Sequence, residues 1–138
     1  MTARPSARMR QQVRRRAGGR CEYRRIHEDD GYVSYQIDHI LARKHGGTTT
    51  LNNLAFTCVL GNRYKGSDIA APDPETGEIV PLFHPRQQQW QEHFALRDAL
   101  IIPLTSTGKA TVILLRLNAP QRVLERAELL RARRHGLL

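Results

Sequence analysis

Hydrophobic positions recur along this chain with helical spacing in some segments and with strand spacing in others. Residues 5–17 predict a helix, because Pro stands early in the segment, one narrow stripe is apolar and two glycines follow. That stripe consists of Met9, Val13 and Ala17. Most other positions are Arg or Gln, so we expect a surface helix whose arginines face solvent or phosphate.

The centre of the chain has the periodicity of a hairpin followed by a helix. Residues 32–37 alternate apolar and polar side chains, as in a half-buried strand, and residues 51–58 return as a short apolar segment. Residues 59–65 then predict one or two helical turns that end at Gly66. This order of strand, loop, short strand and helix predicts an α+β core.

The second half of the chain predicts a turn and three helices. Residues 73–78 place Pro and Gly at turn positions between two short strands. Helices are expected over residues 87–96, from about residue 107 to residue 118, and from Pro120 onward, with arginines at the end of the last one. The side chains expected to face the core are Trp90, Phe94, Ala110, Ile113, Leu114, Leu117, Val123, Ala127 and Leu130, and the terminal arginines are Arg131, Arg133 and Arg134.

Charge is distributed unevenly over a chain whose net charge is +9. Residues 1–25 hold nine Arg against one Glu, and residues 109–138 hold seven basic side chains against two acidic ones. The middle holds six basic against ten acidic side chains. Basic ends suit a phosphate backbone and an acidic centre suits a divalent cation, although a solvated Arg-rich surface explains the same pattern.

Length and cysteine content limit the class of protein. A chain of 138 residues predicts a single domain, at about one domain per 150 residues. The basic N-terminus is not followed by the apolar run of a signal peptide, and no apolar stretch approaches the roughly 18 residues of a membrane span. With Cys21 and Cys58 as its only cysteines, the protein is expected to be cytoplasmic, reduced and without a membrane partner.

Asp38, His39 and Asn62 supply groups that suit metal-assisted hydrolysis of a phosphodiester. A histidine with a pKa of about 6.5 is largely neutral at pH 7 and can accept a proton from water. Carboxylate and amide oxygens suit magnesium or manganese. Because adjacent strand residues point to opposite sides, Asp38 and His39 can share one site only where the backbone bends or the strand ends. Taken alone, the pair favours a polar turn at a strand end over a catalytic site.

Four segments together resemble the HNH endonuclease family. They are residues 20–23 (RCEY), 36–40 (QIDHI), 45–55 (HGGTTTLNNLA) and 58–66 (CVLGNRYKG), within a resemblance that covers roughly residues 15–95. The family resemblance implies an α+β fold with a ββα-metal core. It divides the expected domain of residues 1–138 into a basic helix over 1–19, an HNH core over 20–95 and C-terminal helices over 96–138.

The resemblance also implies roles for individual residues. His39 matches the general base, Asn53 matches the middle Asn that steadies the loop carrying the base, and Asp38 and Asn62 match the metal ligands. Asn62 replaces the final His of the family name, a variation that the family uses. The expected cofactor is one divalent cation, Mg²⁺ or Mn²⁺, with Ni²⁺ as a further candidate. Candidate nucleic-acid contacts, with surface charge as the alternative, are Arg14, Arg15, Arg43, Lys44, Arg63 and Lys65.

The cysteines depart from the family pattern. Many relatives carry two Cys-x-x-Cys knuckles that hold a structural zinc, whereas Arg24 and Gly61 stand here at the positions of the second cysteines. Two thiolates do not make a closed four-ligand zinc site, so a structural zinc is not expected. Cys21 and Cys58 are expected to lie close together, as free thiols packed in a small core or as a disulfide if oxidised.

The function implied by the resemblance is hydrolysis of DNA phosphodiester bonds, with products that carry a 5′-phosphate and a 3′-hydroxyl. Two alternatives stay open: a non-catalytic nucleic-acid-binding module on the same fold, and an RNA nuclease. No base-reading motif is recognised in the sequence, so we expect low sequence specificity unless a protein partner supplies it.

Overall fold

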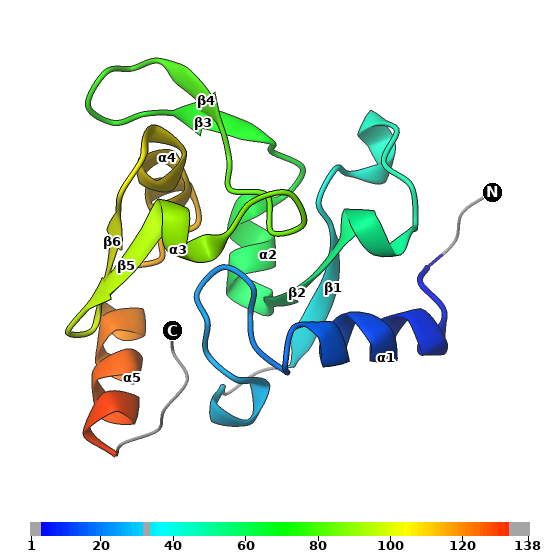
Figure 1. Cartoon of the computed structure of the whole chain (residues 1–138), viewed down its shortest axis with the longest axis horizontal. Helices are drawn as coiled ribbons and strands as arrows, with labels where there is room; N and C mark the ends of the chain where they lie inside the picture. Colours follow the sequence, from blue (N-terminus) through cyan, green and yellow to red (C-terminus); the bar gives the residue numbers. More distant parts are fainter. Residues whose placement is uncertain (1–3, 32–33, 133–138) are drawn as a thin grey trace.

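The computed structural model describes residues 4–31 and 34–132, and Figure 1 shows three two-stranded hairpins with helices packed around them. The α+β class predicted from the sequence is confirmed. None of the described helices is long and apolar enough to cross a membrane. The elements are α1 (Ala7–Arg16), β1 (Tyr35–His39), β2 (Leu54–Cys58), α2 (Val59–Lys65), β3 (Ala70–Pro72), β4 (Ile79–Pro81), α3 (Trp90–His93), β5 (Phe94–Arg97), β6 (Leu100–Pro103), α4 (Ser106–Leu114) and α5 (Pro120–Arg131), with 3₁₀ turns η1 (Glu28–Asp30), η2 (Arg43–His45) and η3 (Leu51–Asn53).

The β1–β2 hairpin lies between α1 and α2 (Figure 1). The strands are antiparallel, with Ile37 opposite Phe56 and Asp38 opposite Ala55. Because side chains alternate along a strand, Ile37 and Phe56 share the face that packs on α1, and Asp38 shares the opposite face with α2. The predicted order of strand, short strand and helix is confirmed, although residues 32 and 33 of the first predicted strand lie outside the described residues.

Helix α1 crosses the hairpin in the way that its apolar stripe predicts. Val13 is fully buried, and the rest of the stripe packs beside it against β2. The Arg16 guanidinium donates to the carbonyl oxygens of Leu51 at 2.8 Å and of Leu54 at 2.6 Å. These two charge-assisted hydrogen bonds fasten the helix to the backbone where β2 begins.

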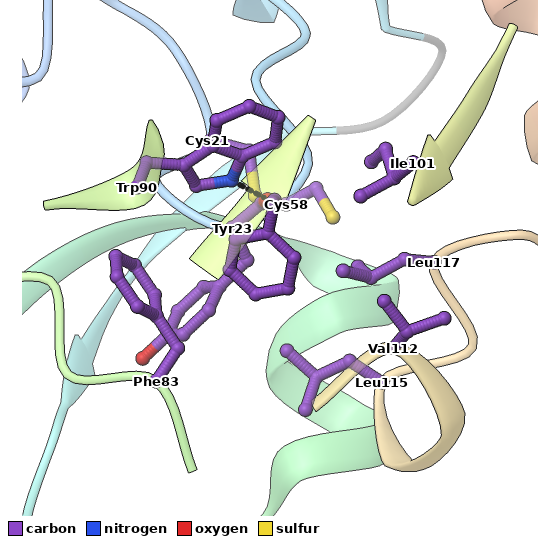
Figure 2. Close-up of a cluster of buried hydrophobic side chains, with 10 residues drawn as sticks. Cys21, Tyr23, Cys58, Phe83, Trp90, Ile101, Val112, Leu115 and Leu117 are labelled. Carbon is purple, nitrogen blue, oxygen red and sulfur yellow. Dashed lines mark hydrogen bonds between the residues drawn. The ribbon is translucent and has the colours of Figure 1, made fainter. Parts of the chain in front are cut away.

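Cys21 and Cys58 are free thiols in the main hydrophobic cluster of the described residues (Figure 2). As expected, they lie close together and share a side-chain hydrogen bond. Aromatic and aliphatic side chains surround them, and the Trp90 indole donates to the Tyr23 carbonyl at 2.8 Å. The other members of the cluster are Phe83, Phe94, Ile101, Val112, Leu115 and Leu117.

Of the helix predicted over residues 87–96, only residues 90–93 are helical, and the prediction is wrong at both ends. Helix α3 is a single turn, and β5 follows it and pairs with β6 across a turn in which Asp98 has a φ of 53°. Trp90 and Phe94 are both buried, so the four-residue spacing correctly indicated that both side chains face the core. Pairing with the apolar strand Leu100–Pro103 overrides the helical pattern, a tertiary effect that local periodicity does not reveal.

The inward face of α4 differs from the predicted one. Ile113 is 62% exposed, whereas Thr111 is fully buried. The Thr111 hydroxyl accepts a hydrogen bond from the Phe83 backbone N–H at 2.9 Å. The helix itself ends at Leu114, earlier than predicted, although Leu117 is buried as expected.

Helix α5 begins at Pro120 as predicted but turns a different face inward. Arg122 and Arg126 are buried, at 3% and 0% exposure, whereas Leu130 is 38% exposed. Arg126 donates to the Ala99 carbonyl at 2.7 Å and, through Nη2, to Asn118 at 2.8 Å. Backbone carbonyls at this position need donors, so guanidinium groups take the place that aliphatic side chains were expected to fill. The predicted terminal arginines at 133 and 134 lie outside the described residues.

The orientation of α5 predicts unequal effects for two alanine substitutions. Arg126→Ala removes two charge-assisted hydrogen bonds and leaves buried acceptors unpaired, so we expect the free energy of unfolding to fall by about 3 kcal/mol. Leu130→Ala is expected to cost less than about 1 kcal/mol, because the side chain is partly exposed. Urea denaturation of the two variants measures both values. A larger loss for Leu130→Ala would support the face predicted from the sequence.

Candidate active site

Asp38 and His39 occupy the last two positions of β1 rather than the residues after the strand. Their side chains therefore lie on opposite faces of the hairpin. Asp38 is on the face that α2 covers, and His39, opposite Leu54, is on the face that α1 covers. The expectation that both groups follow the strand is corrected in this respect.

The Asp38 carboxylate is buried beneath α2, with 6% of the residue exposed. The Lys65 ammonium lies 3.2 Å from its Oδ2 atom, and no other group of the described residues donates a hydrogen bond to that oxygen. Burial raises the pKa of Asp38 to about 6, and the charge of Lys65 opposes that rise. At pH 7 the carboxylate is therefore largely ionised, and its oxygen atoms can act as metal ligands.

Asn62 joins Asp38 on the same face of the hairpin. Its side-chain amide donates to Gln36 Oε1 at 2.6 Å, and Gln36 lies two residues before Asp38 on β1. Gln36 and Asp38 share a face because side chains repeat every second residue.

The donor set on this face fits a hard divalent cation. Asp38 offers a buried carboxylate oxygen that Lys65 alone approaches among the described residues, and Asn62 offers an amide oxygen. Among the described residues, no three or more His, Cys, Asp or Glu side chains gather as a metal site. Magnesium commonly takes only one or two protein carboxylates and completes its shell with water and phosphate oxygens. Two protein ligands are consistent with that mode of binding.

His39 is held on the other face by a hydrogen bond of 2.9 Å between its Nε2 atom and the Thr49 hydroxyl. Partial burial lowers the pKa of His39, and the charge of Arg43 lowers it further. The imidazole is therefore neutral at pH 7, which is the state that accepts a proton.

His39 borders a groove of about 770 Å³ between α1, β1 and η2. Arginines form most of its charged lining, and Glu28 is the acid among them. Glu28 pairs with Arg14 at 2.5 Å, so one of the positive charges is partly neutralised. The basic side chains that line the groove are Arg4, Arg10, Arg14 and Arg43. A neutral histidine thus borders a predominantly positive groove.

Asn53 holds the backbone that follows His39. Its Oδ1 atom accepts from the Leu41 N–H at 2.9 Å, and its Nδ2 atom donates to the carbonyls of Leu41 at 3.0 Å and Thr48 at 2.8 Å. The Asn53 carbonyl also accepts from the Ile40 N–H at 2.9 Å. One residue therefore fixes both the end of β1 and the loop that returns to β2.

Gly47 allows this loop to fold tightly. A Cβ atom at this position would lie 1.7 Å from the Leu41 carbonyl oxygen, so a side chain has no room. The Gly47 N–H donates to the Ala42 carbonyl at 3.0 Å. Glycine is therefore required here for close backbone approach.

Comparison with known families agrees with this geometry. Residues 20–68 match the family model described as HNH endonuclease. Residues 20–68 form an HNH domain. The match covers the β1–β2–α2 unit and confirms the family expected from the sequence. A search of curated proteins finds no match.

In this HNH domain, other groups stand where the second cysteine of each knuckle would be. The Arg24 guanidinium is buried at 5% exposure and pairs with Glu125 at 3.3 Å, and the Gly61 N–H donates to Cys58 Sγ at 3.3 Å. The hydrogen bond from Cys21 lowers the pKa of Cys58 to about 6, and Arg24 adds to that effect. Burial raises the pKa of Cys21 well above its usual range. The Cys21 thiol therefore donates a hydrogen bond to the Cys58 sulfur beside a buried cation.

The candidate nucleic-acid contacts of the HNH domain lie in different places. Arg14 and Arg43 line the groove beside His39, and Arg15 lines a separate shallow hollow with His27. Lys44 and Arg63 are exposed outside the groove. Lys65 is 2% exposed and bonded inside the protein, so its assignment as a phosphate contact is corrected: it is too deeply buried to reach a nucleic-acid backbone.

Sequence reasoning missed three residues of the site. Thr49 bonds the candidate base, Gln36 contacts Asn62, and Arg10 lines the groove one helical turn before Arg14. Strand alternation would have placed Gln36 with Asp38, and helical spacing would have placed Arg10 with Arg14. Nothing in local sequence indicates the contact of Thr49.

The hydrogen bonds of Asn53 predict a sharp contrast with its neighbour Asn52. Asn53→Ala leaves the Leu41 N–H and two carbonyls without partners, so we expect the free energy of unfolding to fall by about 2 kcal/mol. Asn52 is exposed and its Oδ1 atom accepts from Thr50 on the surface, so Asn52→Ala is expected to change stability by less than about 0.5 kcal/mol. Chemical denaturation gives both values. Equal losses of stability would show that the hydrogen bonds of Asn53 do not hold the loop.

Proposed function

We propose that this HNH protein is a metal-dependent endonuclease that hydrolyses DNA phosphodiester bonds. The observation that carries the proposal is the neutral His39 at the side of a groove lined with arginines. The family match supports a nuclease in general terms. Substrate, residue roles and metal are the parts that we propose.

His39 is the general base in this proposal. In the tautomer in which Nε2–H donates to the Thr49 hydroxyl, the Nδ1 atom is unprotonated and accepts a proton from the attacking water. Thr49 fixes the plane of the ring, and Asn53 fixes the backbone immediately after it. The base is therefore held in one orientation before substrate arrives, which favours proton transfer.

Asp38 and Asn62 are the proposed metal ligands. A Mg²⁺ or Mn²⁺ ion held by these two residues would neutralise charge on the phosphate and on the leaving oxygen. Burial under α2 keeps Asp38 out of bulk water, where its carboxylate would be fully hydrated.

A phosphate at the open edge of β1 can reach both faces of the hairpin. In the described part of the chain β1 pairs only with β2, and the far edge of β2 is covered by Glu22, which bonds the Phe56 backbone through its N–H and its carboxylate. Gln36 supports this placement, because it lines the groove and also bonds Asn62. In this proposal a phosphate at the edge of β1 therefore contacts both Asp38 and His39, although their side chains lie on opposite faces of the strand.

The arginines of α1 suit a nucleic-acid backbone. Arg10 and Arg14 lie one turn apart on the wall of the groove, and guanidinium groups bind phosphate oxygens bidentately. The groove fits a non-catalytic binding module equally well, and it does not distinguish DNA from RNA. Cleavage assays with both nucleic acids decide between these functions.

Plasmid cleavage by the purified protein tests the activity. We expect the protein to nick the plasmid in Mg²⁺ or Mn²⁺, and we expect EDTA to abolish the nicking. Ni²⁺ is the third metal to compare. His39→Ala should lower the rate by about 10²–10⁴-fold, because the general base is lost. His45→Ala is the matched control, since His45 is an exposed loop residue, and it should cleave at the wild-type rate.

Three other results of this assay would redirect the proposal. Cleavage of single-stranded RNA in preference to duplex DNA would favour the RNA nuclease. Salt-sensitive DNA binding without cleavage in any metal would favour the binding module. Equal rates for His39→Ala and wild type would remove His39 from the mechanism.

The groove predicts the salt dependence of DNA binding. Arg10→Gln should weaken binding uniformly across sequences and reduce the slope of log K against log salt by about 1, because one phosphate contact is lost. Arg97→Gln is the matched control, since Arg97 is exposed on β5, away from α1 in Figure 1. Fluorescence anisotropy over a salt series measures both slopes. Equal changes in the two variants would show that the effect comes from net charge alone.

A further inference from the structure

Lys65 is a buried lysine whose ammonium group contacts the end of β1. It lies three residues after Asn62 on α2, so both side chains point to the same side of the helix. Its Nζ atom donates to the Ile40 carbonyl at 3.1 Å and lies 3.2 Å from Asp38 Oδ2. Its side chain is 2% exposed, so these contacts replace most of its hydration.

The ammonium and a divalent cation would use the same carboxylate. Asp38 Oδ2 has the Lys65 ammonium beside it and receives no hydrogen bond from any other group of the described residues. Two cations at one oxygen repel each other strongly in a buried position, where the effective dielectric constant is far below that of water. Occupation of Asp38 by a metal therefore requires Lys65 to move or weakens the binding.

The fold leaves room for such a movement. A cavity of about 380 Å³ borders Lys65 and, among the described residues, shares no lining residue with the His39 groove. Its lining includes Asp68, an exposed carboxylate three residues further along the chain, and the amide side chain of Gln88. The Asp68 carboxylate offers oxygen acceptors to a displaced ammonium, whereas the Gln88 amide oxygen already accepts from the His84 N–H at 2.8 Å and has one further lone pair to offer. The Ile40 carbonyl, to which Lys65 now donates, lines the same cavity.

We propose that Lys65 is the resident counter-ion of Asp38, and that a divalent cation displaces its ammonium toward the cavity that contains Asp68. Lys65 is thus a positioning residue: it holds Asp38 and the Ile40 carbonyl in the metal-free protein and opposes metal binding by its charge. The inference rests on the proposed metal ligands. It concerns metal binding and stability, so its test is independent of cleavage.

Metal binding to Lys65→Met tests the displacement. Removal of the competing charge should tighten Mn²⁺ binding about tenfold in isothermal titration calorimetry. Without metal the variant should melt about 10 °C lower, because Asp38 becomes a buried charge without a partner. Mn²⁺ should then raise the melting temperature of the variant more than that of wild type. Lys109→Met is the matched control, since Lys109 pairs with Glu75 at the surface, and it should bind Mn²⁺ as wild type does.

Two further measurements keep the test decisive if Lys65→Met does not fold. The double variant Asp38→Asn/Lys65→Met removes both buried charges, and it should fold and bind Mn²⁺ at least tenfold more weakly than wild type. In wild type, NMR of isotope-labelled lysine resolves only three residues, Lys44, Lys65 and Lys109. Addition of diamagnetic Mg²⁺ should shift the Lys65 Cε and Nζ signals and leave the other two unchanged.

The possible failures are distinguishable. Mg²⁺ binding with an unmoved Lys65 signal, or Mn²⁺ affinity in folded Lys65→Met equal to or weaker than wild type, overturns the displacement and leaves the nuclease proposal intact. No binding of either metal to any variant overturns both the displacement and the proposed ligands. Metal-dependent cleavage with unchanged Mn²⁺ affinity in Asp38→Asn would place the metal elsewhere.

Discussion

The structure around the candidate site depends on the hydrogen bonds that Asn53 makes to the end of β1. Its side chain satisfies the N–H and carbonyl of Leu41 and the carbonyl of Thr48, and its own carbonyl accepts from Ile40. Polar backbone groups in a partly buried loop require partners, and a single amide supplies them here. Lys65 holds the same segment from the other face through the Ile40 carbonyl. With the backbone fixed on both sides, the side chains of Asp38 and His39 point in fixed and opposite directions.

Sequence patterns predicted the half of the fold that depends on local signals. Met9, Val13 and Ala17 defined the buried stripe of α1, and Gly66 marked the end of α2. The second half of the fold was harder to predict from the sequence, because its buried side chains are not purely aliphatic. Phe94 has helical spacing from Trp90 but belongs to a strand, and α5 buries arginines where an apolar face was expected. Local periodicity cannot reveal strand pairing or acceptors supplied by distant loops.

For the site, the sequence identified residue types but not their directions. Motif resemblance indicates Asp38, His39, Asn53 and Asn62. The alternation of side chains along a strand separates the first two. Which face each would take, and the burial of Lys65 against Asp38, depend on how α1 and α2 pack on the hairpin. The same holds for the cysteines: their proximity was expected, whereas the cationic surroundings of Cys58, supplied by Arg24 and Arg122, emerge only from the fold.

The attachment of α1 to the hairpin has a consequence for how the groove receives a ligand. Arg16 bonds two carbonyls at the start of β2, and Val13 packs against the same strand. The basic wall and the histidine therefore belong to one rigid body. The backbone entropy of ordering that wall is lost when the protein folds, whereas its exposed arginine side chains are ordered when a nucleic acid binds. The backbone of the groove is preorganised, and selectivity for a ligand lies in the shape and charge of the groove rather than in a closing motion.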